Sequence, residues 1–217
     1  MEKAIWRLFQ GAVTAGQAGE VVRLVADANR QGYSRREILH EGLLPTLRVI
    51  SEGFERQEIN LPEVLLAVRA VEAALDRLGP HETGNDLGRV VIGTVAGDLH
   101  DLGKRIISLL LQSEGVEVID LGTDVPPAEF VSAVQRYHPD ILAMSALLTT
   151  SVGSFRQTIS LLEASGSRKE VWVMVGGAPV TAELARAVGA DAFARDSLEA
   201  AAVVRELLSR PRGGRRP

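Results

Sequence analysis

The feature that most constrains the fold is a change of sequence pattern near residue 89. Beyond it, short and almost wholly apolar runs alternate with segments of helical periodicity. Continuous apolar runs are what parallel strands buried on both faces require, and the helical segments supply the crossovers between them. The apolar runs are 90–95, 116–121, 141–147, 171–175 and 190–194, and the helical segments are roughly 104–114, 127–137, 152–165, 181–188 and 197–209. The alternation predicts an α/β fold with a doubly wound five-stranded parallel sheet of order 2-1-3-4-5.

The N-terminal part of the chain has helical periodicity and no strand signal. Ser34 followed by Glu37 is a capping-box pattern, which marks the start of a helix. A later helix is expected over about 44–57, and Pro62 suits the first turn of another over 63–78. These segments predict a four-helix-bundle cap ahead of the sheet.

Composition changes mark the expected domain boundaries. A Gly-Pro pair ends the helical pattern, so residues 1–80 form the predicted helical cap domain. The polar stretch 81–88 is expected to be a linker. Residues 89–210 then form the Rossmann-like α/β domain, and the basic residues 211–217 are expected to be a disordered tail.

Composition excludes several classes of function. The chain has 217 residues, 46% of them hydrophobic, with a formal net charge of −4, so nothing draws it generally to nucleic acid. It has no cysteine, which excludes disulfides and thiolate zinc sites. No apolar run approaches the roughly 20 residues of a membrane-spanning helix, and no secretory signal opens the chain. We therefore expect a soluble, cytoplasmic protein that binds neither membrane nor nucleic acid.

Three short motifs stand at fixed spacing in the α/β part. The first reads D-x-H-x-x-G; S-x-L follows after 41 residues, and G-G after another 28. They fall at the ends of the first, third and fourth expected strands, which the order 2-1-3-4-5 makes neighbours. Their residues are Asp98, His100, Gly103, Ser145, Leu147, Gly176 and Gly177. Since the carboxyl ends of parallel strands share one edge, the motifs are expected to meet in the ligand crevice of the sheet.

The residue types at this edge suit a metal centre. A neutral imidazole such as that of His100 is a good ligand for a borderline transition metal. The carboxylate of Asp98, two residues away, can accept the other ring N–H and thereby fix the tautomer of the imidazole.

The combined signature resembles that of corrinoid-binding proteins, which hold cobalamin with its own base displaced and a protein histidine on cobalt. The resemblance implies that His100 is the axial cobalt ligand, that Asp98 is its hydrogen-bond partner and that Ser145 extends the relay from the Asp side. These three are the expected catalytic residues. It also implies close backbone approach to the displaced nucleotide tail at the motif glycines. The residues expected to bind the cofactor in this domain are Gly97, Asp98, Leu99, His100, Asp101, Gly103, Ser145, Leu147, Thr149, Gly176, Gly177 and Ala178.

The resemblance extends to the helical part. The stretch 53–64 is similar to the cap of cobalamin-dependent methionine synthase and of methyltransferase corrinoid proteins. In that family, apolar side chains of the bundle cover the upper face of the corrin. The similarity implies this role for Phe54, Leu61 and Val64, although helix-core packing remains an open alternative for Leu61 and Val64.

The implied function is that of a methyl carrier. A substrate-specific methyltransferase would load a methyl group onto Co(I), giving methylcobalamin in the loaded state. An acceptor methyltransferase would pass it to tetrahydrofolate or a thiol, and a reductive activator would serve as a third partner. The chain would then be the corrinoid subunit of a methyltransferase system and not a complete enzyme alone.

Two alternatives remain open. One is a cobalamin-responsive regulator or storage protein, and the other is the cobalamin subunit of a mutase, which the helical cap disfavours. A nicotinamide-binding domain is excluded, because G-x-G-x-x-G does not follow the first expected strand. A receiver domain is excluded as well, because Ser145 stands where its phosphoacceptor Asp would be.

Overall fold

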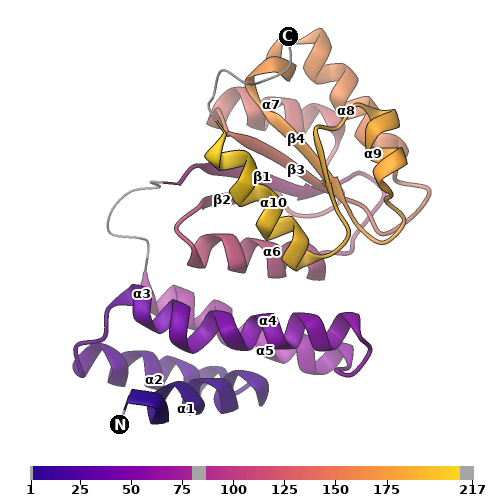
Figure 1. The fold of residues 1–217 in the computed structure, drawn as a ribbon. Helices are drawn as coiled ribbons and strands as arrows, with labels where there is room; N and C mark the ends of the chain where they lie inside the picture. Colours follow the sequence, from indigo (N-terminus) through magenta and orange to yellow (C-terminus); the bar gives the residue numbers. More distant parts are fainter. Residues whose placement is uncertain (1, 80–86, 211–217) are drawn as a thin grey trace. The chain divides into compact units, whose positions relative to one another are not determined.

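A computed structural model describes residues 2–79 and 87–210 of the chain (Figure 1). The chain separates into two compact units, Met1–Gly84 and Asn85–Pro217, each with its own core. Most of the expected linker and the whole expected tail lie outside the described residues, so those boundaries stay predictions. Within the described part of the chain, no helix is long and apolar enough to cross a membrane.

Within residues 2–79, the regular secondary structure of the first unit is helical throughout, as the periodicity predicts. The capping box of Ser34 and Glu37 is confirmed: each side chain bonds the other residue's backbone N–H. A second capping box, between Asn60 and Glu63, was not predicted. It starts the last helix of this unit one turn before the first buried apolar residue of that helix. The helices are α1 (Glu2–Thr14), α2 (Ala18–Arg30), α3 (Arg35–Glu37), a π-helical segment (Ile38–Leu43), α4 (Leu44–Glu55) and α5 (Leu61–Leu78).

The second unit is a five-stranded parallel sheet with the order β2-β1-β3-β4-β5, which confirms the predicted fold class. Its strands are β1 (Arg89–Thr94), β2 (Glu117–Asp120), β3 (Ile141–Ser145), β4 (Trp172–Gly176) and β5 (Ala192–Ala194). Its helices are α6 (Leu102–Ser113), α7 (Pro127–Tyr137), α8 (Gly153–Ala164), a 3₁₀ turn (Ser167–Glu170), α9 (Ala182–Val188) and α10 (Ser197–Ser209).

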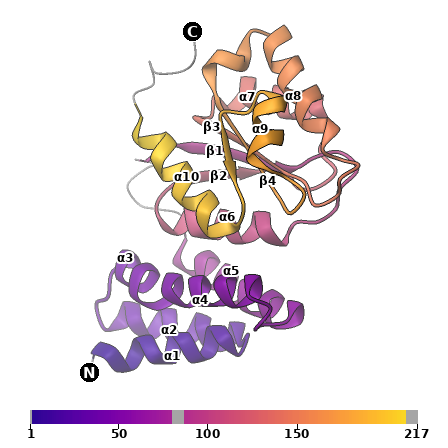
Figure 2. The ribbon, with the colours of Figure 1, turned by 45° about the vertical axis from the view of Figure 1, so that its right-hand side comes forward.

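Helices cover both faces of this sheet (Figure 2). Helices α6 and α10 pack together on one face, while α7, α8 and α9 cover the other. On the α7–α8 side, the aromatic rings of Phe130 and Phe155 are fully buried among the strand side chains. This two-sided burial explains why the strands read as continuous apolar runs.

The register of the strands aligns the motifs at one edge. Thr94 of β1 pairs with Ser145 of β3, Ser145 pairs with Gly176 of β4, and Gly176 pairs with Ala194 of β5. The loops that carry the three motifs therefore leave the sheet side by side, as the predicted order requires.

Strand β3 is shorter than predicted. It ends at Ser145, whereas the apolar run continues to Leu147. The backbone N–H groups of Leu147 and Leu148 point instead to the carboxylate of Asp98. An apolar run cannot reveal this, because hydrophobicity does not show where the ladder gives way to a side-chain acceptor.

Gly177 is required where the loop after β4 passes the loop after β3. Its φ of +122° lies in a region that L side chains rarely adopt, and a Cβ atom there would lie 1.9 Å from the backbone oxygen of Ala146. Both the conformation and the close approach therefore exclude a side chain.

We expect Gly177→Ala to lower the free energy of unfolding by about 3 kcal/mol, because backbone strain and a backbone overlap must both be relieved. Urea unfolding of the protein without cofactor measures this. Gly103→Ala is the matched control, since a Cβ atom at Gly103 meets nothing within 4 Å. In the first turn of α6 it should be neutral or stabilise by up to about 1 kcal/mol. Equal stabilities for the two variants would contradict this account.

Candidate functional site

The loop between β1 and α6 is held in a fixed shape before any ligand is considered. Gly97 has a φ of +81° and lets the chain turn, so that the backbone N–H of Asp98 bonds back to the carbonyl of Val95 at 3.2 Å. Asp124 braces the loop from the β2 side. Its carboxylate accepts the N–H of Gly97 at 2.7 Å, and its own N–H donates to the carbonyl of Asp98 at 2.9 Å.

The Asp98 carboxylate is the centre of the site. It is completely buried. Oδ1 accepts the backbone N–H of His100 at 3.0 Å and lies 2.7 Å from Nδ1 of its ring. Oδ2 accepts the N–H groups of Leu147 and Leu148 at 2.5 and 3.0 Å, and the hydroxyl of Ser151 lies 3.3 Å away. One carboxylate therefore joins the loop after β1 to the loop after β3.

These hydrogen bonds keep Asp98 ionised. Burial alone raises the pKa of Asp98, because it penalises the charged form. The donors from His100, Leu147 and Leu148 outweigh burial and hold the pKa far below its usual range. A carboxylate that stays charged is a permanent acceptor for the imidazole of His100.

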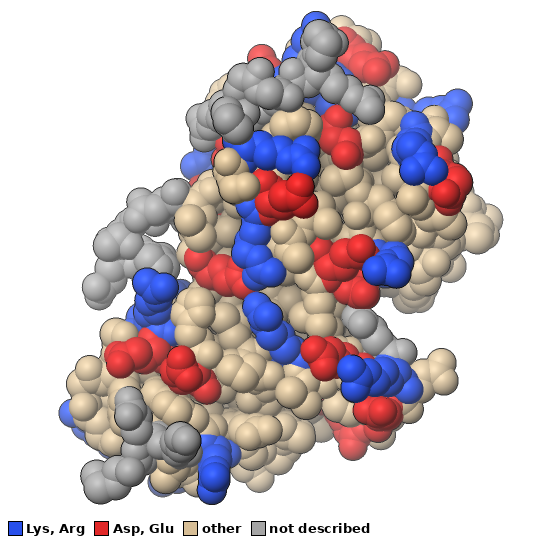
Figure 3. All heavy atoms as spheres, viewed as in Figure 1, with Lys and Arg blue, Asp and Glu red and all other residues tan. Residues whose placement is uncertain are grey.

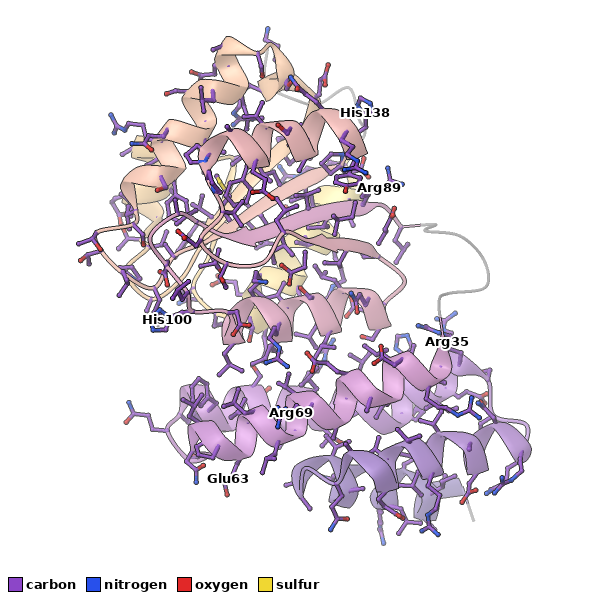
Figure 4. The ribbon with its side chains drawn as sticks, turned by 180° about the vertical axis from the view of Figure 1, so that it is seen from behind. Arg35, Glu63, Arg69, Arg89, His100 and His138 are labelled. Carbon is purple, nitrogen blue, oxygen red and sulfur yellow. The ribbon has the colours of Figure 1, made fainter. Side chains whose placement is uncertain are left out.

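His100 presents one nitrogen inward and the other outward. A charged carboxylate can only accept, so in the neutral ring Nδ1 carries the proton and donates it to Asp98. The lone pair is then on Nε2. The side chain is 55% exposed and stands on the loop between β1 and α6 (Figure 4). An outward imidazole nitrogen of fixed tautomer is what a transition metal requires of a histidine ligand.

The structure places Ser145 differently from the predicted relay. Its hydroxyl lies 3.1 Å from Oγ1 of Thr94, and Thr94 in turn donates to the backbone carbonyl of His100 at 3.0 Å. Within the part of the chain that the structure describes, no hydrogen bond joins Ser145 to Asp98. The physical reason is that Ser145 still belongs to β3, in register with Thr94, whereas the donors to Asp98 come from the loop beyond it. The hydroxyl nearest to Asp98 is that of Ser151.

Sequence reasoning missed two residues of this site. Thr94 is fully buried at the last position of β1, and Ser151 is 4% exposed in the turn before α8. A buried threonine at a strand end and a serine six residues beyond Ser145 carry no motif of their own. Only the register of β1 and β3 and the fold of the loop bring them to the site.

Exposed apolar side chains lie on the two loops that Asp98 joins. Leu99 is 73% exposed, Leu147 44% and Leu148 40%, which makes them some of the most exposed large apolar side chains in the described residues. Leu147 and Leu148 are tied to Asp98 through their backbones, so their side chains lie on the same loop pair as His100. Exposed leucines on the same loops as an imidazole with a free lone pair suit a broad apolar ligand such as a macrocycle.

The remaining predicted residues lie at the end of β4, on the loops or at the start of α6 at this edge. Gly103 and Asp101 stand at the start of α6, Thr149 lies exposed beyond Leu148, and Ala178 lies exposed after the glycine pair. Open space surrounds Gly97 and Gly103, whereas Gly176 and Gly177 approach neighbouring backbone closely. A flat metal-bearing ring with a trailing tail fits this combination of an exposed imidazole nitrogen, an apolar surround and side-chain-free loops.

The three predicted cap residues lie in the first unit, with differing exposure. Val64 is completely buried on the stripe of α5 that also holds Val68 and Val71. Leu61, at the start of the same helix, is 49% exposed, and Phe54 near the end of α4 is partly exposed. Whether these side chains cover a bound cofactor stays a prediction.

Charge does not gather at one place on the drawn face. In Figure 3, acidic and basic side chains lie interspersed over both units. This face therefore lacks the one-signed field that would steer a nucleic acid.

The sequence as a whole matches families that bind the same cofactor. Residues 88–204 match the B12 binding domain, and residues 7–78 match a second family model of the same description. The chain belongs to the family of B12-binding corrinoid proteins.

Its relatives include two dimethylamine corrinoid proteins. The protein of Methanosarcina barkeri is 42% identical over 194 residues, which cover 88% of this chain and 91% of the relative. Dimethylamine corrinoid protein 2 of Methanosarcina acetivorans is 42% identical over 201 residues, covering 91% and 93%.

Two solved structures resemble the chain over nearly its whole length. A cobalamin-binding protein from Desulfitobacterium hafniense has a TM-score of 0.70 at 28% identity, covering 93% of this chain and 98% of the other. The monomethylamine corrinoid protein of Methanosarcina barkeri has a TM-score of 0.63 at 29% identity, covering 95% and 100%.

The buried carboxylate predicts a specific dependence of stability on pH. At neutral pH, Asp98→Asn should lower the free energy of unfolding by about 3 kcal/mol, because an amide cannot satisfy the converging donors. The folded-state pKa of Asp98 lies below its unfolded value, so its contribution is complete above the ordinary pKa of 3.8 and is lost as pH falls further. The difference between wild type and Asp98→Asn should therefore shrink below about pH 4.

Chemical unfolding of the protein without cofactor between neutral pH and pH 3 tests this dependence. Asp101→Asn serves as the control, since the Asp101 side chain makes no capping hydrogen bond to α6. A gap between wild type and Asp98→Asn that stays constant with pH would show that Asp98 is not held ionised by its donors.

Proposed function

We propose that this chain holds a corrinoid in the base-off/His-on form, with Nε2 of His100 as the axial ligand of cobalt. The observation that carries the proposal is that the two nitrogens of one imidazole have different environments. Nδ1 is held at 2.7 Å by a buried carboxylate, while the other nitrogen is left for a metal, on a pair of loops that also carry exposed leucines. The family membership supports the cofactor itself, and the motif glycines support a bound nucleotide tail.

The bound cofactor would supply a cobalt centre that accepts and releases a methyl group; the protein supplies ligation, orientation and exclusion of water. Asp98 keeps the proton of His100 on Nδ1, so that Nε2 keeps its lone pair for the metal. Leu99, Leu147 and Leu148 offer an apolar bed for the ring.

The first unit would protect the opposite face of the ring. We infer this role for Phe54, Leu61 and Val64 from the resemblance; Phe54 and Leu61 keep exposed apolar surface that suits it, whereas Val64 is completely buried. Apolar cover at such a site excludes water from a reactive metal centre.

We further propose that the chain carries methyl groups in a methylamine methyltransferase system. The support is its similarity to dimethylamine corrinoid proteins over more than four fifths of both chains. A methyltransferase acting on a methylamine would load the methyl group, an acceptor methyltransferase would pass it to tetrahydrofolate or a thiol, and a reductive activator would restore the cofactor.

Ligation by His100 can be tested by spectroscopy. Wild-type protein given cobalamin should bind it with its own base displaced and a protein nitrogen on cobalt. In His100→Ala, the spectroscopic signal of a protein nitrogen on cobalt should disappear. Cobalamin should also bind at least about tenfold more weakly, because the ligand and its carboxylate partner act together. His138→Asn is the control: His138 caps α7 in a left-handed conformation that asparagine tolerates. Retention of the nitrogen signal in His100→Ala would remove His100 from this role.

The methyl donor can be tested by transfer of label. The protein, once it has bound cobalamin and been reduced, should acquire labelled methyl from dimethylamine in the presence of a dimethylamine methyltransferase. Parallel reactions with monomethylamine, trimethylamine and methanol, each with its own methyltransferase, measure selectivity, and His100→Ala shows how far transfer depends on ligation. Labelling from methanol alone would contradict the assignment to methylamines.

A further inference from the structure

The loop after β2 continues to pair with the end of β1 beyond the last residue of β2. The N–H of Thr94 donates to the carbonyl of Gly122 at 3.0 Å, and the N–H of Val125 donates to the carbonyl of Thr94 at 2.9 Å. A parallel bridge then joins Val95 to Val125. The loop after β2 therefore runs beside the loop that carries His100, and both are fixed to the same strand.

Asp124, in the loop after β2, fastens the chain just before His100 by two hydrogen bonds. Its Oδ1 accepts the N–H of Gly97 at 2.7 Å, and its own N–H donates to the carbonyl of Asp98 at 2.9 Å. Both bonds hold the backbone of the histidine loop and leave its side chains untouched. They fix the turn at residues 97–98 from which His100 follows.

A second contact fastens the chain just after His100. Lys104, in the first turn of α6, is 4% exposed, and its ammonium pairs with both carboxylate oxygens of Asp120 at the end of β2. The same carboxylate accepts the N–H of Gly122 at 2.8 Å. The end of β2 and the loop after it thus hold residues 97–104, the histidine segment, on both sides of the imidazole.

The backbone at Asp124 has a conformation that few side chains tolerate. Its φ is +56°, in the left-handed region, where aspartate and asparagine are enriched among non-glycine residues. Among the described non-glycine residues, only Gln57 and His138 also have a positive φ. The position needs a left-handed backbone and a side-chain acceptor for Gly97, and aspartate supplies both.

We propose that Asp124 is a positioning residue for His100 that acts through the backbone. The proposal rests on the function proposed above. Asp98 fixes the tautomer and the rotation of the imidazole, whereas Asp124 fixes the place of the segment that carries the ring. Loss of the acceptor at Asp124 should therefore loosen the histidine segment and weaken ligation of cobalt, while the ring proton stays on Nδ1.

Two substitutions separate the carboxylate of Asp124 from its backbone conformation. Asp124→Gly keeps the left-handed backbone and the N–H bond to Asp98, but it removes the acceptor for Gly97. Asp124→Asn keeps the left-handed backbone and an acceptor oxygen. His138→Gly is the matched control, because His138 is also exposed and left-handed, with a φ of +46°, but lies at the end of α7.

The first test uses the protein without cofactor. Relaxation of the backbone ¹⁵N nuclei of residues 97–100 should show a rigid segment in the wild type, with order parameters of about 0.85. Asp124→Gly should lower these values to about 0.6, while Asp124→Asn and His138→Gly should keep them. The ¹⁵N shifts of the imidazole should report the Nδ1–H form of His100 in every variant.

The second test uses the protein loaded with cobalamin. The share of cobalt(II) that shows coupling to an imidazole nitrogen in electron paramagnetic resonance measures ligation by His100. Asp124→Gly should lower the ratio of ligated to unligated cobalt about tenfold, because ligation must then re-order about one residue of backbone. Asp124→Asn and His138→Gly should keep the wild-type ratio.

Four results would overturn the proposal. They are an Asp124→Gly variant identical to wild type in either test, an Asp124→Asn variant as impaired as Asp124→Gly, an equal effect of His138→Gly, and a changed tautomer of His100 in Asp124→Gly. If the wild-type protein showed no nitrogen coupling at all, the proposed function would fail. The relaxation measurements would still decide whether Asp124 holds the histidine segment in place.

Discussion

The site depends on one buried charge. Asp98 has no exposed surface, and a carboxylate can remain ionised there only if donors converge on it. They come from two loops: His100 from the loop after β1, and Leu147 and Leu148 from the loop after β3. Satisfying the charge therefore fixes the relative position of these loops. The orientation of the imidazole follows from the same bonds, so the stability of the loops and the orientation of the ring have one physical origin.

The architecture could be predicted because it depends on local sequence patterns. Continuous apolar runs such as 90–95 and 171–175 identify strands buried on both faces, and the sheet order follows from the five alternating units. The capping box at Ser34 could also be predicted, because its two residues are three positions apart in the sequence. The residue at which β3 ends could not be predicted from the sequence. Hydrophobicity continues to Leu147, but the backbone leaves the ladder after Ser145 to serve an acceptor 49 residues earlier in the chain.

The site likewise contains contacts that a local sequence pattern predicts and contacts that it does not. D-x-H-x-x-G places a carboxylate two residues from an imidazole, and that spacing suffices for the contact at 2.7 Å between Asp98 and His100. The partners of this pair belong to other strands. Thr94 and Ser151 have no motif, and Ser145, which has one, bonds Thr94. Long-range hydrogen bonds depend on register and loop geometry, which residue types do not specify.

The glycines at this edge differ in what the fold demands of them: Gly177 has no room for a side chain, and Gly103 has. At Gly177 the backbone of the preceding loop occupies the space of a side chain, so glycine is required by the fold itself. At Gly103 the space is open and the backbone is helical, so the fold would accept a side chain. Glycine at Gly103 gives up helix stability without relieving any contact within the chain. Under the function proposed here, the open space beside the first turn of α6 would be available to the cofactor.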